Sequence, residues 1–324
     1  MVDVLDIPSM PRSWIPNEFQ GWTTSAPIVD THVHVNAGLG EVRTFCEVAS
    51  KFNVKTVGAI VHGASWFKSL PMKRMGHYYI PFHSFEQATN SGDYSVLDDM
   101  KQEGAVAIKF WFATRYFRGK KRIDTPEFAR FLREVGKHGL VVAIHVSDPT
   151  SWHGTKYREK TFGTKEFMRE QVLWLVGEAP ETTFLLVHMG GNPENPQGLS
   201  DELDAHQNMY LDTSATKWVS RELSRHHGDA VALFHKHDDR ILFGTDIVIP
   251  PHNAGAMNNK EYYVSRYLVQ RMMLEHDGAF NSPIPDPDNK EGMPLQGLGL
   301  NETILDRVYR ENARSIFQRI SWQE

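Results

Sequence analysis

The stretch IVDTHVHV at residues 28–35 places two histidines, His32 and His34, in a run that is otherwise typical of a buried strand. Side chains two apart on a strand point to the same side, so both imidazoles face one surface. Strands this apolar are typical of parallel sheets covered on both faces. Seven similar runs follow, at residues 54–62, 78–85, 105–112, 140–146, 182–189, 208–214 and 239–246.

Segments with helical periodicity separate these runs. Residues 40–53, 125–139 and 164–180 are examples, and Thr125 and Thr164 are suited to cap the second and third of them. Eight strands alternating with helices predict an α/β fold, a (β/α)8 TIM barrel. The structural alternative is a doubly wound open sheet. The sequence HVNAGLGEV after the first strand is a poor match to the glycine-rich turn of such sheets.

One domain accounts for most of the chain. Residues 1–26 form an N-terminal extension, and residues 27–324 form the barrel. Residues 247–300 are longer than an ordinary connection after a barrel strand, which favours a functional role for them. They contain the apolar stretch 261–274, which would cover the barrel mouth or pack against a second subunit. A closing helix is predicted over residues 301–320.

Composition and charge narrow the class of protein. The chain has 324 residues, a net charge of −5 with both signs interspersed, and one cysteine. This excludes a disulfide framework and gives no reason to expect binding to nucleic acid or to a membrane. The N-terminus has no signal-peptide pattern. We therefore expect a soluble cytoplasmic protein with a small-molecule substrate, and a homodimer or higher homo-oligomer stays open.

Ligand-type side chains recur where the predicted strands end, and chemistry in such barrels gathers at this edge. Imidazoles and a carboxylate that converge there suit a catalytic divalent metal, with zinc expected first and manganese as the alternative. Asp30 is expected to orient one imidazole through its second nitrogen. The metal-ligand candidates are His32, His34, His145 and Asp246.

Several motifs resemble those of the amidohydrolase superfamily, and within it the branch of metal-dependent hydrolases that includes aminocarboxymuconate semialdehyde decarboxylase-like enzymes. The resemblance implies that the four candidates bind the metal and that Asp246 also transfers protons. It implies that His188 lies beside the metal-bound water as an acid/base or holds the substrate. The motifs are DTHVH (30–34), AIHVSD (143–148), LLVHMGG (185–191), FGTD (243–246) and VYRENARSIF (308–317).

Lys109, inside the fourth predicted strand, has two interpretations. In binuclear members of the superfamily a lysine there is carboxylated and bridges a second metal; alternatively, a buried lysine pairs with a substrate carboxylate. Arg115 and His252 are further candidates for substrate binding. Aromatic candidates for the pocket wall are Trp66, Trp111, Tyr116 and Trp152.

These residues support two enzyme classes that share one site. The first is a metal-dependent hydrolase of a small-molecule amide, lactone or ester, which uses metal-activated water. The alternative is a nonoxidative decarboxylase of an aromatic or unsaturated carboxylic acid. A third interpretation, a binding protein that has lost catalysis, would predict the loss of a ligand, yet every expected ligand is present.

Overall fold

The structure is a computed structural model that describes residues 26–36, 39–62, 75–90, 92–250, 258–290 and 292–318. Residues 1–25 of the predicted N-terminal extension lie outside the described residues, as do Trp66 and the candidate substrate-binding residue His252. Within the described ranges, no helix combines the length and hydropathy needed to cross a lipid bilayer.

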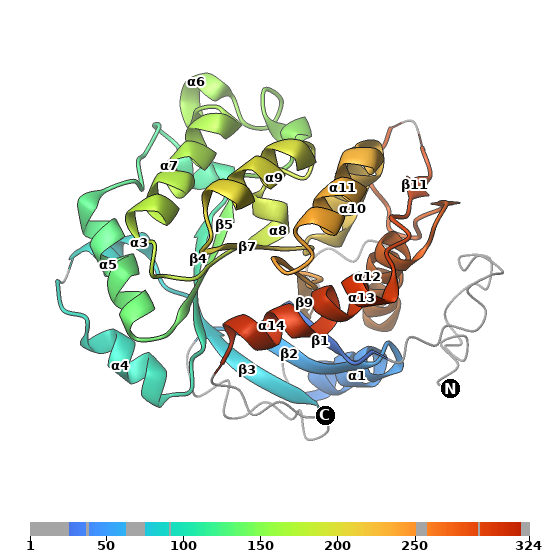
Figure 1. The fold of residues 1–324 in the computed structure, drawn as a ribbon, viewed down its shortest axis with the longest axis horizontal. Helices are drawn as coiled ribbons and strands as arrows, with labels where there is room; N and C mark the ends of the chain where they lie inside the picture. Colours follow the sequence, from blue (N-terminus) through green and yellow to red (C-terminus); the bar gives the residue numbers. More distant parts are fainter. Residues whose placement is uncertain are drawn as a thin grey trace.

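Short parallel strands form the centre of the molecule, and helices surround them (Figure 1). The strands make two sheets, one in the order β3-β2-β1-β9 and one in the order β4-β5-β6-β7-β8. Their bounds are β1 (Ile28–Val35), β2 (Val54–Val61), β3 (Gly76–Pro81), β4 (Ala107–Phe112), β5 (Val141–Val146), β6 (Phe184–Leu186), β7 (Met209–Asp212), β8 (Ile241–Leu242) and β9 (Ile247–Ile249).

Backbone hydrogen bonds join the two sheets into the predicted (β/α)8 barrel. On one side, β3 meets β4 through a parallel bridge between Phe82 and Lys109. On the other side the eighth barrel strand is divided, so that β8 pairs with β7 and β9 pairs with β1. Between them, the carbonyl of Phe243 accepts a hydrogen bond from the N–H of Thr31 at 3.0 Å. Closure brings the first and last strands together, which is what a site shared between them requires.

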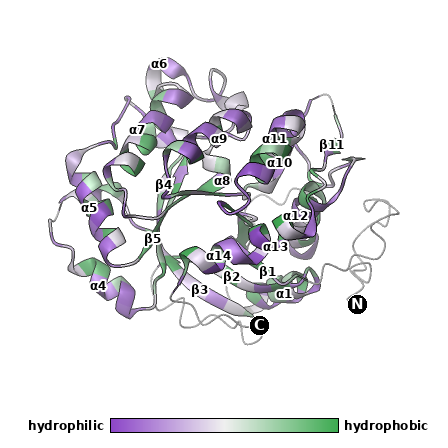
Figure 2. Cartoon of the chain, viewed as in Figure 1, coloured by the Kyte–Doolittle hydropathy of each residue, from purple (hydrophilic) through white to green (hydrophobic). Residues whose placement is uncertain are grey.

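Helices with one apolar face cover the barrel. In Figure 2 helices α5 and α7 carry both hydrophobic and hydrophilic residues, as expected where one face packs on a sheet. The predicted caps are confirmed, because Thr125 and Thr164 accept backbone hydrogen bonds at the starts of α5 and α7. The main helices are α1 (Leu39–Lys51), α3 (Phe85–Asn90), α4 (Ser95–Gln102), α5 (Pro126–Lys137), α7 (Lys165–Glu178), α9 (Pro196–Ala205), α10 (Thr216–Arg225) and α11 (His227–Lys236).

Helix α12 (Asn259–Glu275) accounts for the apolar stretch 261–274 within residues 247–300. Asn258 and Glu261 form a capping box at its start, and most of its side chains are buried. It packs against α1 and α10, so it takes the place of the eighth outer helix of the barrel. The apolar stretch 261–274 is therefore covered by its own chain and needs no second subunit. That the remainder of the segment shapes the barrel mouth stays a proposal.

The C-terminal segment, residues 302–317, covers the amino ends of the barrel strands. The predicted closing helix consists of α13 (Glu302–Asp306), a π-helical turn (Arg307–Glu311) and α14 (Asn312–Ile316). Phe317 follows it and packs on Tyr78, with 4.8 Å between ring centroids. Both rings belong to an apolar cluster that includes inward residues of the barrel strands. The carboxyl ends of the strands are therefore the edge left for a binding site.

Candidate metal centre and active site

The chain turns through left-handed backbone conformations where several barrel strands end. Residues other than glycine rarely adopt positive φ, and such strain concentrates at functional sites. The turns follow β5, β6, β7 and the eighth strand, so the strain is concentrated at this half of the barrel mouth. The residues are Ser147 (φ 66°), His188 (φ 58°), Met189 (φ 51°), Ala215 (φ 61°) and Asp246 (φ 60°).

Three potential ligand atoms converge at the carboxyl ends of β1 and the eighth strand. The Nε2 atoms of His32 and His34 are 3.3 Å apart. Oδ1 of Asp246 lies 3.4 Å from the first and 3.2 Å from the second. A tetrahedral site with ligand bonds of about 2.1 Å places its ligand atoms about 3.4 Å apart. The separations of this cluster, which we call the His-His-Asp cluster, therefore fit a divalent metal ion.

Asp212 at the end of β7 orients the first of these imidazoles. Its Oδ2 lies 3.0 Å from Nδ1 of His32, and both groups are buried. A carboxylate only accepts hydrogen bonds, so this contact requires a proton on Nδ1 and turns the lone pair of Nε2 towards the cluster. Asp212 is a site residue that the sequence motifs did not indicate. The available signal was a carboxylate at the end of the apolar run 208–214, in the position where Asp246 ends its own strand.

The expectation that Asp30 orients an imidazole was wrong. Its Oδ1 accepts the backbone N–H groups of His32 at 3.2 Å and Thr245 at 3.1 Å. Its Oδ2 accepts the hydroxyls of Thr245 at 2.7 Å and Tyr267 at 2.9 Å. Burial raises the pKa of Asp30 to about 7 although these hydrogen bonds act to lower it. Asp30 therefore ties β1 to the eighth strand and to α12 beneath the site.

His188 and His145 form a second pair of imidazoles next to the His-His-Asp cluster. Nε2 of His188 lies 3.2 Å from Nδ1 of His145, and Nδ1 of His188 lies 2.8 Å from the hydroxyl of Ser214. Nε2 of His145 lies 2.8 Å from the carbonyl oxygen of Ser147, to which it must donate. Burial lowers the pKa of both imidazoles. Among the described residues, His145 contacts His188 and does not join the cluster, so its role as a ligand stays a prediction.

Lys109 is buried within the barrel. Its side chain is 1% exposed, and its Nζ has no hydrogen-bond partner among the described residues. Burial lowers the pKa of Lys109 to about 8, whereas the charges of Asp212 and Asp246 act to raise it. An unpartnered buried amine beside acidic groups fits a site that takes up a further group. Carboxylation of Lys109 and its pairing with a substrate carboxylate both stay proposals.

The electrostatics favour the protonation states in which this cluster binds metal. Burial and the charge of Lys109 lower the pKa of His32 to about 4, against the opposing effect of Asp212. Burial alone would raise the pKa of Asp246, but the hydrogen bond from His34 and the nearby imidazoles lower it well below its usual range. At neutral pH the imidazole is therefore neutral and the carboxylate ionised, as metal ligands must be.

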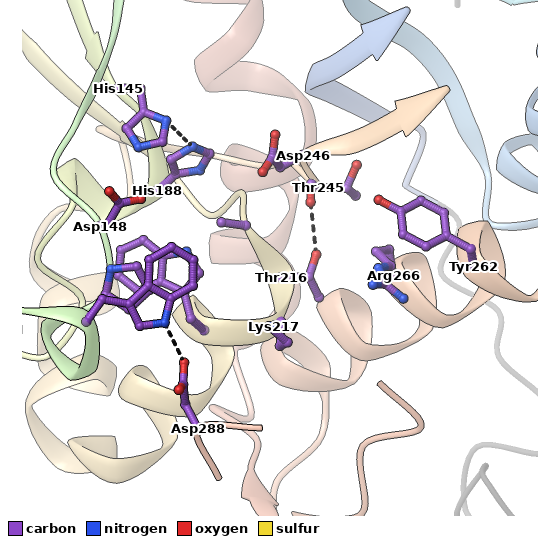
Figure 3. A pocket seen from close by; sticks show the side chains of 14 residues that line it. His145, Asp148, His188, Thr216, Lys217, Thr245, Asp246, Tyr262, Arg266 and Asp288 are labelled. Atoms are coloured by element: carbon purple, nitrogen blue, oxygen red, sulfur yellow. Dashed lines mark hydrogen bonds between the residues drawn. The ribbon is translucent and has the colours of Figure 1, made fainter. Parts of the chain in front are cut away.

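A cavity of about 270 Å³ opens beside the cluster (Figure 3). His145 and His188 lie on one side in this view, Tyr262 and Arg266 lie on the other, and Asp246 lies between them. Asp246 is the member of the His-His-Asp cluster that lines this cavity. The cavity is thus the candidate substrate pocket, and it places substrate next to a residue that also contacts both cluster imidazoles.

The predicted pocket residues fall in two places. Trp152 lines the candidate substrate pocket, as expected. Trp111 and Tyr116 line a different hollow of about 480 Å³ beside β3 and β4. The guanidinium carbon of Arg115 lies 4.3 Å from the centroid of the Trp111 ring, whose own distance from the His145 ring is 6.0 Å. Substrate binding by Arg115 and Trp111 therefore stays a prediction, and neither residue lines the pocket beside the cluster.

Comparisons with known proteins agree with this architecture. A sequence profile of the amidohydrolase family matches residues 72–319, more than half of the chain. Comparison with curated proteins gives no match. Among solved structures, a probable 2-pyrone-4,6-dicarboxylic acid hydrolase from Acinetobacter baumannii aligns with a TM-score of 0.57 and 12% identity, over 90% of this chain and 99% of that chain. A candidate amidohydrolase from Staphylococcus aureus aligns with a TM-score of 0.52 and 9% identity, over 90% and 99%.

A closed parallel barrel with histidines and carboxylates at the carboxyl ends of its strands defines a class of barrel enzymes that use metal ions. The profile match identifies the group within this class: the chain belongs to the amidohydrolase family. At identities this low, the similarity to solved structures supports the fold alone. The profile match begins after β1, so the His-x-His pair adds to it independently.

Proposed function

We propose that the protein is a metal-dependent hydrolase that cleaves an amide, lactone or ester of a small molecule. The position of Asp246 carries this proposal. Its Oδ1 contacts both cluster imidazoles, its side chain is 30% exposed, and it lines the candidate substrate pocket. A carboxylate with access to water beside a metal centre suits proton transfer during hydrolysis.

In this proposal the cluster, Asp246 and His188 have separate roles. The His-His-Asp cluster would hold one divalent ion, with His145 as a further proposed ligand. Such an ion supplies Lewis acidity, which polarises a substrate carbonyl and makes water nucleophilic near neutral pH. Asp246 takes the proton from the attacking water and returns it to the leaving group. His188, fixed by the hydroxyl of Ser214 at 2.8 Å, faces the same pocket and donates a hydrogen bond or a proton to the substrate.

Nonoxidative decarboxylation of an aromatic or unsaturated acid is the second proposal. Lys217 and Arg266 line the pocket and would anchor an acid there. Protonation at carbon requires a site that excludes water, whereas the side chains of Asp246 and His34 are 30% and 17% exposed. This exposure favours hydrolysis.

Metal analysis of the full chain, purified after metal-replete expression, is the first test. We expect about one divalent ion per chain, zinc in preference to manganese; two ions would instead support a bridging carbamate on Lys109. A screen then compares lactones, esters and amides with aromatic acids, with carbon dioxide release as the readout for decarboxylation. Asp246→Asn is the matched inactive variant. An empty cluster in metal-loaded protein, or hydrolysis that survives this substitution, would refute the mechanism.

A further inference from the structure

The candidate substrate pocket contains two cationic side chains that the proposed reaction does not use. Lys217 comes from the first turn of α10, and Arg266 comes from the second turn of α12. The acids that line the same pocket already have partners. Asp148 accepts a backbone N–H at 2.9 Å, Asp288 accepts an indole N–H at 3.0 Å, and Asp246 contacts the cluster imidazoles. In Figure 3 Arg266 lies on the side of the pocket opposite His145 and His188, where it offers positive charge to a bound molecule.

Arg266 is held in a defined orientation. Its guanidinium carbon lies 4.0 Å from the ring centroid of Tyr262, one helical turn earlier, and its Nη1 donates to the hydroxyl of Ser265 at 2.8 Å. Tyr262 is 7% exposed, so the ring is a fixed platform. Stacking on an aromatic ring fixes the plane of a guanidinium and reduces the entropy lost when it binds a planar anion.

The rest of the pocket suits a small planar molecule. Trp152 and Trp218 line it together with Tyr262, and aromatic side chains bind flat apolar groups well. The volume of about 270 Å³ is close to the lower end of ordinary ligand pockets. In Figure 3 Asp246 lies between the histidine pair and Arg266, so a molecule spanning the pocket would reach both.

We propose that Arg266 is a specificity residue that binds a carboxylate of the substrate away from the bond that is cleaved, with Lys217 adding positive charge. The substrate class is then small planar organic acids that carry a carboxylate in addition to an ester, lactone or amide. The nature of the cleaved bond rests on the proposed function, whereas carboxylate binding by Arg266 does not. The planar, bidentate geometry of arginine matches a carboxylate better than a lysine would.

Binding of isophthalate, a planar dicarboxylate, tests the subsite directly by calorimetry on the full chain as purified and again after chelation. Neutral isophthalamide is the matched probe. We expect isophthalate to bind in both states. Arg266→Met should weaken its binding by about 10- to 100-fold, as for hydrogen bonds between charged groups, and leave isophthalamide within about twofold. Arg266→Lys should fall between, and Arg130→Met, an exposed arginine on α5, should match the wild type.

A structural role for Arg266 would give a different result. Equal weakening of both probes in Arg266→Met, or a lowered melting temperature that Arg266→Lys shares, would overturn the proposal. So would binding that disappears on chelation, because the metal would then hold the carboxylate. Hydrolysis of 4-acetoxybenzoate and its neutral methyl ester tests the function separately. If neither is hydrolysed while isophthalate binding depends on Arg266, the proposed function fails and the carboxylate subsite stands.

Discussion

Replacing Asp212 with asparagine should disable the metal centre without touching a ligand. Oδ1 of Asp212 accepts the backbone N–H groups of His188 at 2.7 Å and Ser214 at 3.0 Å, so the amide oxygen of asparagine takes this place. The amide nitrogen then faces Nδ1 of His32, which Oδ2 now contacts at 3.0 Å. Because that nitrogen donates, His32 must accept at Nδ1 and carry its proton on Nε2. An imidazole protonated at Nε2 cannot bind the ion through that atom.

The structure sets the size of the effect. Burial alone would raise the pKa of Asp212, but the charge and hydrogen bond of His32 and the bond from Ser214 lower it to about 2. A hydrogen bond to a charged group contributes about 2 kcal/mol, and Asp212→Asn removes the one that the carboxylate accepts from His32. Loss of a residue that orients a metal ligand usually lowers affinity by about 10- to 100-fold, and the change of tautomer acts in the same direction. We expect zinc affinity to fall by about 100-fold and the metal-free fold to lose about 2 kcal/mol.

Competition with a chromophoric chelator measures zinc affinity, and chemical denaturation of metal-free protein measures stability. Asp239→Asn is the matched control. This carboxylate is 64% exposed, and its ion-pair partner Arg240 lies 3.9 Å away, so the interaction that the substitution removes is weak. The control should behave as wild type in both assays. If Asp212→Asn keeps wild-type zinc affinity, the assignment of the His32 tautomer is wrong.

Five further substitutions test the site and the fold. His34→Ala should lose metal and activity together, whereas His188→Ala should lose activity and keep most of the metal; equal metal loss would place His188 among the ligands. Gly191→Ala should destabilise the fold by about 2 kcal/mol or more, because φ is +68° and the new Cβ would collide with the carbonyl at the end of β5. In Gly228→Ala the new Cβ meets open space in α11, so the free energy of unfolding should rise by up to about 1 kcal/mol. Chemical denaturation measures both glycine variants, and an equal loss of stability in the two would contradict this reasoning. Burial lowers the pKa of His83, so wild type should lose stability as pH falls below about 6.5, and His83→Gln should lose less; parallel stability curves would refute this.

Local composition determined much of the architecture. The apolar β-branched runs form strands because they are buried on both sides whichever strands they pair with. Thr125 and Thr164 begin helices because their hydroxyls satisfy a backbone N–H within three residues. The pair His32 and His34 was visible for the same reason, since strand alternation alone turns both to one face. These features depend on neighbours in the chain, so they can be predicted from the sequence.

The tertiary structure decided those features that depend on contacts between residues far apart in the chain. An apolar helical stretch indicates burial but not its partner, and only the packed barrel shows that α12 fills the eighth outer position. The carboxylate that orients His32 is likewise not the adjacent Asp30 but Asp212, 180 residues away. Closure of the barrel brings the ends of β1 and β7 together, and the reach of a side chain across that closed edge is fixed by strand register and twist. The contact between His32 and Asp212 therefore cannot be predicted from any short stretch of the sequence.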